Sequence, residues 1–290
     1  MNRQELIDYL RANQIWAKRT MGQNFLVDEQ ALAQIVAAAD IQSTDTIVEI
    51  GPGLGVLTAE LSKRAGKVIA IEKDDILAQV LNDEIRMRND EQMSNVEILN
   101  QDALEFDPES YKLKAGSYKL VANIPYNITS LIIRKFLEEE NKPEIIVLLV
   151  QKEVAERIIA KPGDMSLLAV SVQFYAKVEI VAIVPKESFF PTPKVDSAII
   201  KLKVKSQKHK VQSREFFRIV KFGFAAKRKT LENNLSAGMH IKKDDARDII
   251  KKAGFEAKIR AEDLSVEDWI RLFEIIKEGD SGEKRENQNL

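Results

Sequence analysis

Short apolar runs alternate with segments of helical periodicity over the first two thirds of the chain. Five runs rich in Val, Ile and Leu have the length and composition of buried strands, and most are followed by apolar residues at helical spacing. This alternation favours an α/β fold, a parallel sheet with helices on both faces. The strands are predicted at residues 46–50, 67–74, 95–99, 118–125 and 144–150, and the clearest helices at residues 2–12, 28–39, 75–88 and 129–140.

The pattern changes twice in the last third of the chain. Two more strands are predicted at residues 178–185 and 197–204, close enough in sequence to form an antiparallel pair. After residue 204 only helical periodicity continues. We therefore expect three parts: a domain over residues 1–204 with an N-terminal extension at 1–20, a small all-α domain over 205–278, and a loose tail over 279–290.

Composition narrows the chemistry. The 290 residues include no Cys and only two His, which excludes disulfides, thiolate nucleophiles and Cys metal sites. A His-based metal site or a Ser-His-Asp triad is disfavoured, so we expect no metal. The lack of Cys suits the reducing cytoplasm. No apolar run reaches the roughly 18 residues of a membrane helix, so we expect no membrane span.

Charge is divided unevenly along the chain. The net charge is −1, but residues 1–204 contain 24 Lys and Arg against 30 Asp and Glu, whereas residues 205–290 contain 20 against 15. A basic second part indicates a polyanionic partner held at one end of the molecule. A solvated helical surface is the alternative interpretation of the same charges.

A glycine-rich loop follows the first strand. Gly51, Gly53 and Gly55 lie between a strand and a helix, where glycine allows positive φ and close approach of a ligand. Glu72 ends the second strand and Asp102 follows the third, so both carboxylates are expected at the same sheet edge. Together they indicate a nucleoside site, with ribose hydroxyls on Glu72 and an adenine amine on Asp102. A purely structural tight turn remains the alternative.

The charge of Glu49 favours one nucleoside cofactor over another. Glu49 directly precedes the loop and is expected to place a negative charge beside the ligand. Such a charge disfavours the pyrophosphate of NAD and suits the positive sulfonium of S-adenosyl-L-methionine. We therefore expect S-adenosyl-L-methionine as the cofactor.

The segment Asn123-Ile124-Pro125-Tyr126 follows the fourth strand and is suited to hold an amine. The Asn123 side-chain oxygen and the Ile124 carbonyl can each accept an N–H of an exocyclic adenine amine. Pro125 restrains the carbonyl before it, and Tyr126 offers a flat face for stacking of the base. Catalysis would then consist of positioning and electrostatics. A strand-ending turn without chemistry is the alternative.

A base inside a duplex cannot enter such a pocket, so the substrate is expected to be a loop or flipped nucleotide. The segment 189–195 between the two late strands contains two aromatic residues and two prolines. We expect Phe190 to sandwich the base opposite Tyr126, and Phe189 to be a core residue.

Basic residues in the helical part share one predicted face. Arg214, Arg218, Lys221 and Arg228 fall on one side of a helix, and Phe216, Val220, Phe224 and Leu231 on the other. If Thr230 instead caps a new helix, Arg228 leaves this face. Lys227, Arg228 and Lys229 form a dense cluster in either case. With Lys18 and Arg19 near the N-terminus, these residues are predicted to contact RNA phosphates.

Six motifs together resemble the rRNA adenine N6,N6-dimethyltransferases. They are QNFL (23–26), EIGPGLG (49–55) with Glu72, QDAL (101–104), NIPYN (123–127), FFPTPKVDS (189–197) and KRKTLENNL (227–235), the last of which is similar to the KsgA-type branch. The resemblance implies a Rossmann-like seven-stranded class I methyltransferase sheet with a small helical C-terminal domain. It also implies dimethylation of two adjacent adenosines in a hairpin loop near the 3′ end of small-subunit (16S) rRNA, and a role in maturation of the immature small ribosomal subunit.

The resemblance assigns residues one by one. It implies that Asn24, Leu26, Gly51, Glu72, Asp102 and Asn123 bind the cofactor and that Asn123, Tyr126 and Phe190 bind the target base. Asn24 and Leu26 rest on the resemblance alone. Ile124 stands where this branch often has Leu, and the branch that modifies large-subunit rRNA also uses Ile there, so that position does not assign the substrate.

Three other functions remain open at this point. They are a large-subunit (23S) rRNA adenine methyltransferase that confers antibiotic resistance, a ribosome-assembly factor with incidental catalysis, and a nicotinamide oxidoreductase. Nothing in the sequence demands a dimer, and we expect a monomer.

Overall fold

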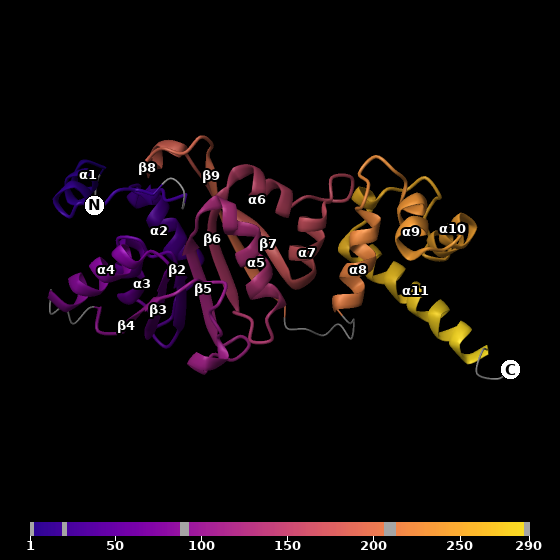
Figure 1. Ribbon diagram of the computed structural model, residues 1–290, viewed down its shortest axis with the longest axis horizontal. Helices are drawn as coiled ribbons and strands as arrows, with labels where there is room; N and C mark the ends of the chain where they lie inside the picture. The colour runs from indigo at the N-terminus through magenta and orange to yellow at the C-terminus, as the bar shows by residue number, and fades with distance from the viewer. Residues whose placement is uncertain (1–2, 19–21, 88–92, 206–212, 287–290) are drawn as a thin grey trace. The chain divides into compact units, whose positions relative to one another are not determined.

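The computed structural model describes residues 3–18, 22–87, 93–205 and 213–286 (Figure 1). The chain divides into two compact units. The first, the sheet unit, comprises Met1–Glu156 and Tyr175–Ser206, and the second, the helical unit, comprises Arg157–Phe174 and Gln207–Leu290. No helix in the described ranges is long and apolar enough to cross a bilayer.

A seven-stranded sheet forms the centre of the sheet unit, in the order β4-β3-β2-β5-β6-β9-β7. Five neighbouring strands are parallel, and β9 is antiparallel to both β6 and β7. The strands are β2 (Thr46–Ile50), β3 (Lys67–Glu72), β4 (Val96–Asn100), β5 (Tyr118–Asn123), β6 (Ile145–Gln151), β7 (Ala176–Val184) and β9 (Ser197–Val204). The predicted α/β class, parallel strands and late antiparallel pair are confirmed.

The strand order reverses between β2 and β5. From β2 the chain adds β3 and β4 on one side, and it then crosses to add β5 and β6 on the other. Loops at the carboxyl ends of two such strands diverge and leave a crevice between them. Ile50 of β2 pairs with Ala122 of β5, so Gly51 and Asn123 emerge side by side at this crevice.

Helices pack on the sheet because their apolar faces match the apolar strands. Asp28 caps α2 by accepting from the amides of Gln30 and Ala31. The fully buried Ile35 of α2 and Leu61 of α3 pack in one cluster with strand residues. The helices of this unit include α1 (Arg3–Ala12), α2 (Glu29–Ala38), α3 (Val56–Ser62), α4 (Asp75–Met87) and α5 (Thr129–Glu138).

A second, two-stranded sheet has no counterpart in the prediction. β1 (Phe25–Leu26) pairs antiparallel with β8 (Phe189–Phe190), which brings together segments about 160 residues apart. Leu6 and Leu10 of α1 are buried against the same region, in a cluster that also contains Leu54 of the glycine loop. The N-terminal extension is therefore packed onto the sheet unit.

The helical unit contains most of α7 (Leu167–Tyr175) and the helices that follow β9 in the described residues. The α-helices after β9 are α8 (Ser213–Gly223), α9 (Leu231–Met239), α10 (Lys243–Lys252) and α11 (Val266–Glu286). Its core is built around the fully buried Trp269 and Phe216, and the Phe216 ring stacks on Phe174 with centroids 4.6 Å apart.

Two features of this unit differ from the predicted boundaries. Residues 157–174 belong to the helical unit although they precede β7 and β9, because Phe174 packs against Phe216 and the amides of Gly163 and Met165 donate to the Glu262 carbonyl. Residues 279–286 continue α11 instead of forming a loose tail.

Candidate active site

A cavity of about 340 Å³ opens at the carboxyl ends of β2, β3 and β5. This position is the switch point at which the strand order reverses, where α/β sheets bind ligands. Its walls come from five loops that follow β-strands or precede them. The lining includes residues 22–27, 49–54, 56–57, 71–73, 101–104 and 123–128, together with Leu6, Leu32 and Leu77.

The glycine loop folds tightly because three of its residues have positive φ. The φ values of Gly51, Gly53 and Gly55 are 69°, 58° and 75°. Each of their amides already has a partner within the protein. Gly51 N donates to the Ile71 carbonyl (2.9 Å), Gly55 N to the Pro52 carbonyl (2.9 Å) and Gly53 N to the Glu72 carboxylate (3.1 Å). The glycine amides are thus committed to internal bonds and do not form a phosphate cradle.

Glu72 is held by two backbone amides at the end of β3. One carboxylate oxygen accepts from Gly53 N, and the other accepts from Asp74 N at 2.9 Å. The side chain is nearly buried, and this burial raises the pKa of Glu72 above its ordinary value despite both bonds. The carboxylate is consequently fixed in one orientation beside the glycine loop.

Glu49 does not supply the charge that the sequence predicted. Its side chain is 1 % exposed, and burial, with a contribution from the nearby Glu72 carboxylate, raises the pKa of Glu49 to about 8. The carboxyl is therefore largely protonated at pH 7. The prediction of a negative Glu49 beside the loop is wrong, because the sequence does not show how completely the β2 strand end is buried.

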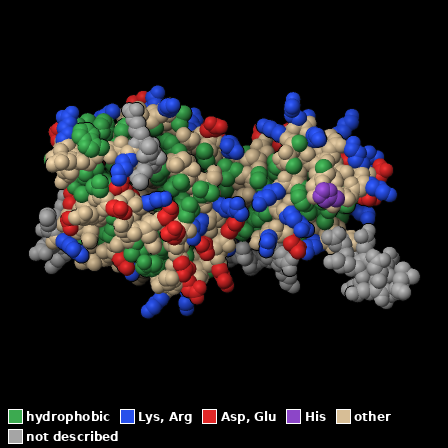
Figure 2. All heavy atoms as spheres, viewed as in Figure 1, with side chains coloured by type: hydrophobic (Ala, Val, Ile, Leu, Met, Phe, Trp, Pro, Cys, Tyr) green, Lys and Arg blue, Asp and Glu red, His purple; other side chains and the backbone are tan. Residues whose placement is uncertain are grey.

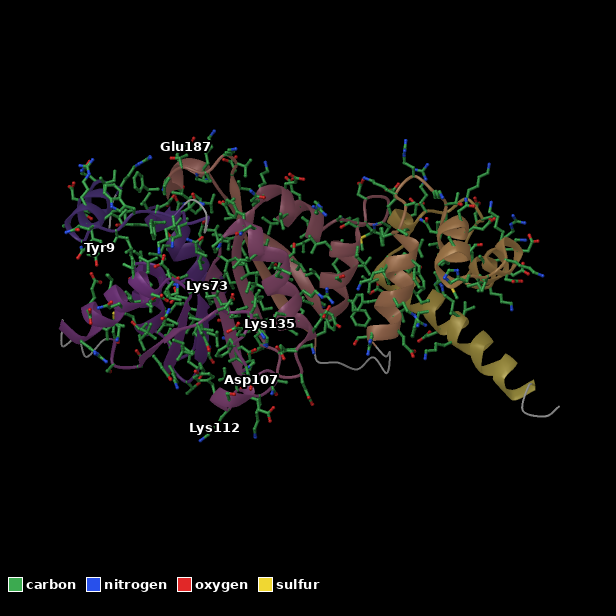
Figure 3. The ribbon with its side chains drawn as sticks, viewed as in Figure 1. Tyr9, Lys73, Asp107, Lys112, Lys135 and Glu187 are labelled. Atoms are coloured by element: carbon green, nitrogen blue, oxygen red, sulfur yellow. The ribbon has the colours of Figure 1, made fainter. Side chains whose placement is uncertain are left out.

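Asp102 is ionised but already paired. Lys73, labelled in Figure 3, reaches the Asp102 carboxylate at 2.7 Å, and the Leu104 amide donates to its other oxygen at 2.9 Å. The Lys73 bond is the main cause of a lowered pKa of Asp102. One Asp102 oxygen is thus engaged by a lysine that no sequence argument identified.

Asn123 stands opposite the glycine loop. Its carbonyl oxygen lies 3.6 Å from the place where a Cβ on Gly51 would be, so the two strand ends are in close contact. The side-chain Nδ2 donates to the Asn24 carbonyl at 3.4 Å. Since the two amide heavy atoms diverge, this bond orients Oδ1, the acceptor needed for an amine, in another direction.

Tyr126 begins the short helix η4 (Tyr126–Ile128) and lines the cavity. Its hydroxyl shares a hydrogen bond of 2.6 Å with Oγ of the fully buried Ser197. Burial raises the pKa of Tyr126 and keeps the phenol neutral. The tyrosine is therefore anchored at its polar end, while its ring forms part of the cavity wall.

Phe190 lies outside the cavity lining. The β1–β8 pairing sets it opposite Phe25, and the Arg3 guanidinium lies 5.6 Å from the centre of its ring. The structure brings Phe190 next to the segment that contains Asn24. Phe189 is fully buried in the core, as predicted.

Of the two N-terminal basic residues predicted to contact RNA, Lys18 and Arg19, the structure describes only Lys18. Lys18 forms a 2.8 Å ion pair with Asp74, so its ammonium is directed at the protein. Arg19 lies outside the described residues. The neighbouring Asn24 and Leu26 line the cavity, as does Leu6 of α1, which no sequence signal identified.

The basic surface of the helical unit is only partly as predicted. Arg214, Arg218 and Lys221 are exposed on α8, opposite the buried Phe216 and Val220. Lys and Arg side chains lie over much of this unit on the face drawn in Figure 2.

Arg228 does not share the α8 face. That helix ends at Gly223 and α9 begins after Thr230, so the alternative of a new helix is confirmed. Lys227, Arg228 and Lys229 are exposed in the connection between the two helices.

Comparison with known proteins places this site in a family. The sequence model of the family described as ribosomal RNA adenine dimethylase matches residues 15–278. The chain belongs to the ribosomal RNA adenine dimethylase family. The match covers nearly all the described residues of both units, and it includes the strand ends that form the cavity.

Relatives of the dimethylase family share most of the chain. The ribosomal RNA small subunit methyltransferase A of Dehalococcoides mccartyi (strain ATCC BAA-2266 / KCTC 15142 / 195) is 43% identical over 264 residues, which cover 90% of this chain and 89% of that protein. The protein of the same name from Clostridioides difficile (strain 630) is 43% identical over 265 residues, covering 89% and 90%.

Two solved structures share the fold. A dimethyladenosine transferase from Plasmodium falciparum has a TM-score of 0.75 at 28% identity and covers 88% of this chain and 98% of that one. The 23S rRNA methyltransferase ErmE has a TM-score of 0.68 at 28% identity, covering 87% and 99%. The class I methyltransferase fold with a helical C-terminal region is thereby confirmed, and the chain is an rRNA adenine dimethyltransferase.

Proposed function

We propose that this dimethyltransferase transfers methyl groups from S-adenosyl-L-methionine to N6 of two adjacent adenosines in the 3′-terminal hairpin loop of small-subunit (16S) rRNA, within the immature small ribosomal subunit. The names of the relatives from Dehalococcoides mccartyi and Clostridioides difficile support the small subunit as substrate. The basic helical unit supports RNA as the polymer that is bound.

The observation that favours S-adenosyl-L-methionine is that the glycine amides of the loop already donate hydrogen bonds within the protein. A pyrophosphate needs free amides at the loop, and here Gly51, Gly53 and Gly55 all donate within the protein. A nucleoside without phosphates can be held by carboxylate acceptors, which Glu72 and Asp102 provide. The cavity volume of about 340 Å³ is within the usual range for small ligands.

The residues that line the cavity can hold the ribose, the adenine and the methionine part of S-adenosyl-L-methionine. Glu72, fixed by two amides, would accept from the ribose hydroxyls, and Asp102, oriented by the Leu104 amide, would accept from the adenine amine. Asn24 and Leu26, which also line the cavity, would contact the methionine part. When bound, S-adenosyl-L-methionine supplies an activated methyl group on a positive sulfur.

Asn123 and its neighbours would bind the second substrate. Oδ1 of Asn123 and the carbonyl of Ile124 would each accept one N–H of the target amine, which localises the nitrogen lone pair. The Tyr126 ring, anchored by Ser197, would stack on the base. As the new N–C bond forms, the S–methyl bond of the donor would break to leave a neutral thioether, and the methylated amine, now acidic, would lose its proton to water, so a dedicated base is unnecessary. These residues therefore act by positioning and electrostatics.

Phe190 remains a proposed second stacking partner with one condition. In the structure its ring is covered by the Arg3 guanidinium, which also donates to the Thr192 hydroxyl. A base could stack on that face of the ring only if the guanidinium of the exposed Arg3 side chain were displaced. The cytoplasmic location and the monomeric state stay predictions.

Transfer of labelled methyl groups tests the proposal directly. Purified enzyme and labelled S-adenosyl-L-methionine are incubated with immature small subunits and, in parallel, with large-subunit rRNA, and the modified nucleotides are mapped by mass. We expect N6,N6-dimethyladenosine at two adjacent positions of the small-subunit hairpin. Label only in large-subunit rRNA would support the resistance-type alternative. An inactive variant that restores maturation in full would support the assembly factor.

A further inference from the structure

A buried carboxylate joins the N-terminal cavity segment to the end of β3. The segment of residues 22–27 contributes Asn24 and Leu26 to the cavity, and the two-residue strand β1 and the bond from Asn123 to the Asn24 carbonyl hold it on one side. Asp74 lies on the other side, two residues after Glu72, and its side chain is only 2 % exposed.

Asp74 binds this segment at two points. Its Oδ2 accepts from the Lys18 ammonium at 2.8 Å and from the Gln23 side-chain amide at 3.0 Å. The Lys18 backbone amide in turn donates to Gln23 Oε1 at 2.8 Å, so the three residues form a closed set of bonds. Gln23 directly precedes Asn24, whose position is therefore tied to Asp74.

The same residue also orients the ribose carboxylate. The Asp74 backbone amide donates to Glu72 Oε1 at 2.9 Å, and Oδ1 accepts from the Ile76 amide at 3.1 Å at the start of α4. Asp74 thus holds groups from two separate segments of the cavity lining. Although burial opposes ionisation, the bonds from Lys18 and Gln23 outweigh it and lower the pKa of Asp74.

We infer that Asp74 is a positioning residue that holds Lys18 and Gln23, and through Gln23 the adjoining Asn24, at the cavity, and that Lys18 serves this lock of three residues and does not contact RNA. The inference rests on the proposed function, since the cavity is taken to hold S-adenosyl-L-methionine. The lock sets the position of Asn24 and Leu26. It acts through these two residues and does not touch the reacting atoms.

Conservative variants separate the lock from other roles. Asp74→Asn keeps the size of the side chain and an acceptor for the Ile76 amide, but it removes the charge that binds Lys18. Lys18→Met keeps the aliphatic stem and removes the ammonium. Glu97→Gln is the matched control, since it breaks a 2.8 Å ion pair with Lys67 at the opposite end of β3.

Cofactor affinity is measured by calorimetry with S-adenosyl-L-methionine and no RNA. Asp74→Asn and Lys18→Met are each expected to weaken binding about tenfold, as for loss of one charge-assisted hydrogen bond. The double variant is expected to be no weaker than either single one, because both remove the same interaction. Glu97→Gln should bind as the wild type does. In the methyl-transfer assay the KM for cofactor should rise while kcat at saturation stays near the wild-type value.

Three results would overturn the inference. They are losses that add in the double variant, unchanged cofactor affinity in Asp74→Asn, and a Lys18→Met variant with a raised KM for RNA and normal cofactor affinity. If the wild type binds no S-adenosyl-L-methionine, the proposed function fails, and limited proteolysis still tests the lock. Trypsin should then cleave after Lys18 faster in Asp74→Asn than in Glu97→Gln, and equal rates would count against the lock.

Discussion

The cavity of the sheet unit and the basic surface of the helical unit are built on opposite principles. In the cavity, Glu72, Asp102 and Tyr126 each have a named partner at 2.6–3.1 Å, and their pKa values are shifted. On the helical unit, Arg214 and the 227–229 cluster stand exposed to solvent. Catalysis by positioning requires fixed groups, whereas phosphate binding requires mainly charge density. The difference implies that single changes in the cavity act strongly and single changes on the surface act weakly.

The largest effect is expected at Asn123. In Asn123→Ala the amine loses an acceptor that polarises it in the transition state, and kcat should fall by at least about 100-fold, the scale of losing one preorganised group. Cofactor affinity should fall far less. Single-turnover methyl transfer measures the loss of rate, and calorimetry measures cofactor affinity. Asn13→Ala is the control, because Asn13 is exposed and also donates its amide to one main-chain carbonyl. Near-normal kcat in Asn123→Ala would refute the amine-site assignment.

The next effect concerns the core that supports the basic surface. A Cβ on Gly223 would lie 2.2 Å from the ring of the fully buried Trp269, so Gly223→Ala should destabilise the protein by about 1–3 kcal/mol through overpacking. Gly279 of α11 has open space around it, and Gly279→Ala should instead add a few tenths to about 1 kcal/mol. Urea unfolding followed by circular dichroism measures both. A shift of the same sign in the two variants would contradict this account of the helical core.

These elements show why part of the fold was predictable and part was not. Long strands such as β6 and β9 can be recognised in the sequence, because their apolar residues are continuous or alternate over seven or eight positions. β1 and β8 have two residues each, too few for any period, and their pairing depends on a contact between distant segments. The prediction that Arg228 shares the α8 face was wrong because the helix ends at Gly223. This glycine packs on Trp269, a contact that the local sequence pattern does not show.

The candidate site divides in the same way. Gly51, Glu72 and Asp102 follow from their places at strand ends, because the parallel topology alone brings them together. The protonation of Glu49 and the pairing of Lys18 with Asp74 depend on burial and on partners that only the folded chain supplies. Sequence patterns therefore located the chemistry but misjudged its charges.

A smaller effect is expected on the basic surface. Replacing Lys227, Arg228 and Lys229 together by Gln should weaken rRNA binding about tenfold. The slope of log affinity against log salt should become shallower by up to about 0.7–0.9 for each phosphate that the variant no longer neutralises. Cofactor affinity should not change. The control replaces Lys243, Lys251 and Lys252 of α10, which are equally exposed in the same unit. If both triple variants flatten the slope equally, the 227–229 cluster has no special role and only the overall charge of the unit matters.

The smallest effect is expected in the pH dependence of cofactor binding, because Glu49 in the cavity is largely neutral at pH 7. Its pKa is about 8 because burial disfavours the charge, and a bound sulfonium would favour the ionised form and lower that pKa. Binding should then release a proton, so cofactor affinity rises with pH and levels off above the free-enzyme pKa of about 8. The slope cannot exceed about tenfold per pH unit for one proton.

A matched variant isolates the contribution of Glu49 from that of the cofactor itself. The α-amino group of the cofactor titrates in the same range, near about 7.7–8.0. Glu49→Gln retains that contribution and removes only the one from Glu49, so the difference between the two pH profiles measures it. Calorimetry in buffers of different ionisation enthalpy counts the released protons. Identical profiles and proton counts for wild type and Glu49→Gln would show that the sulfonium does not sense Glu49, and discrimination between cofactors would then rest on the committed glycine amides alone.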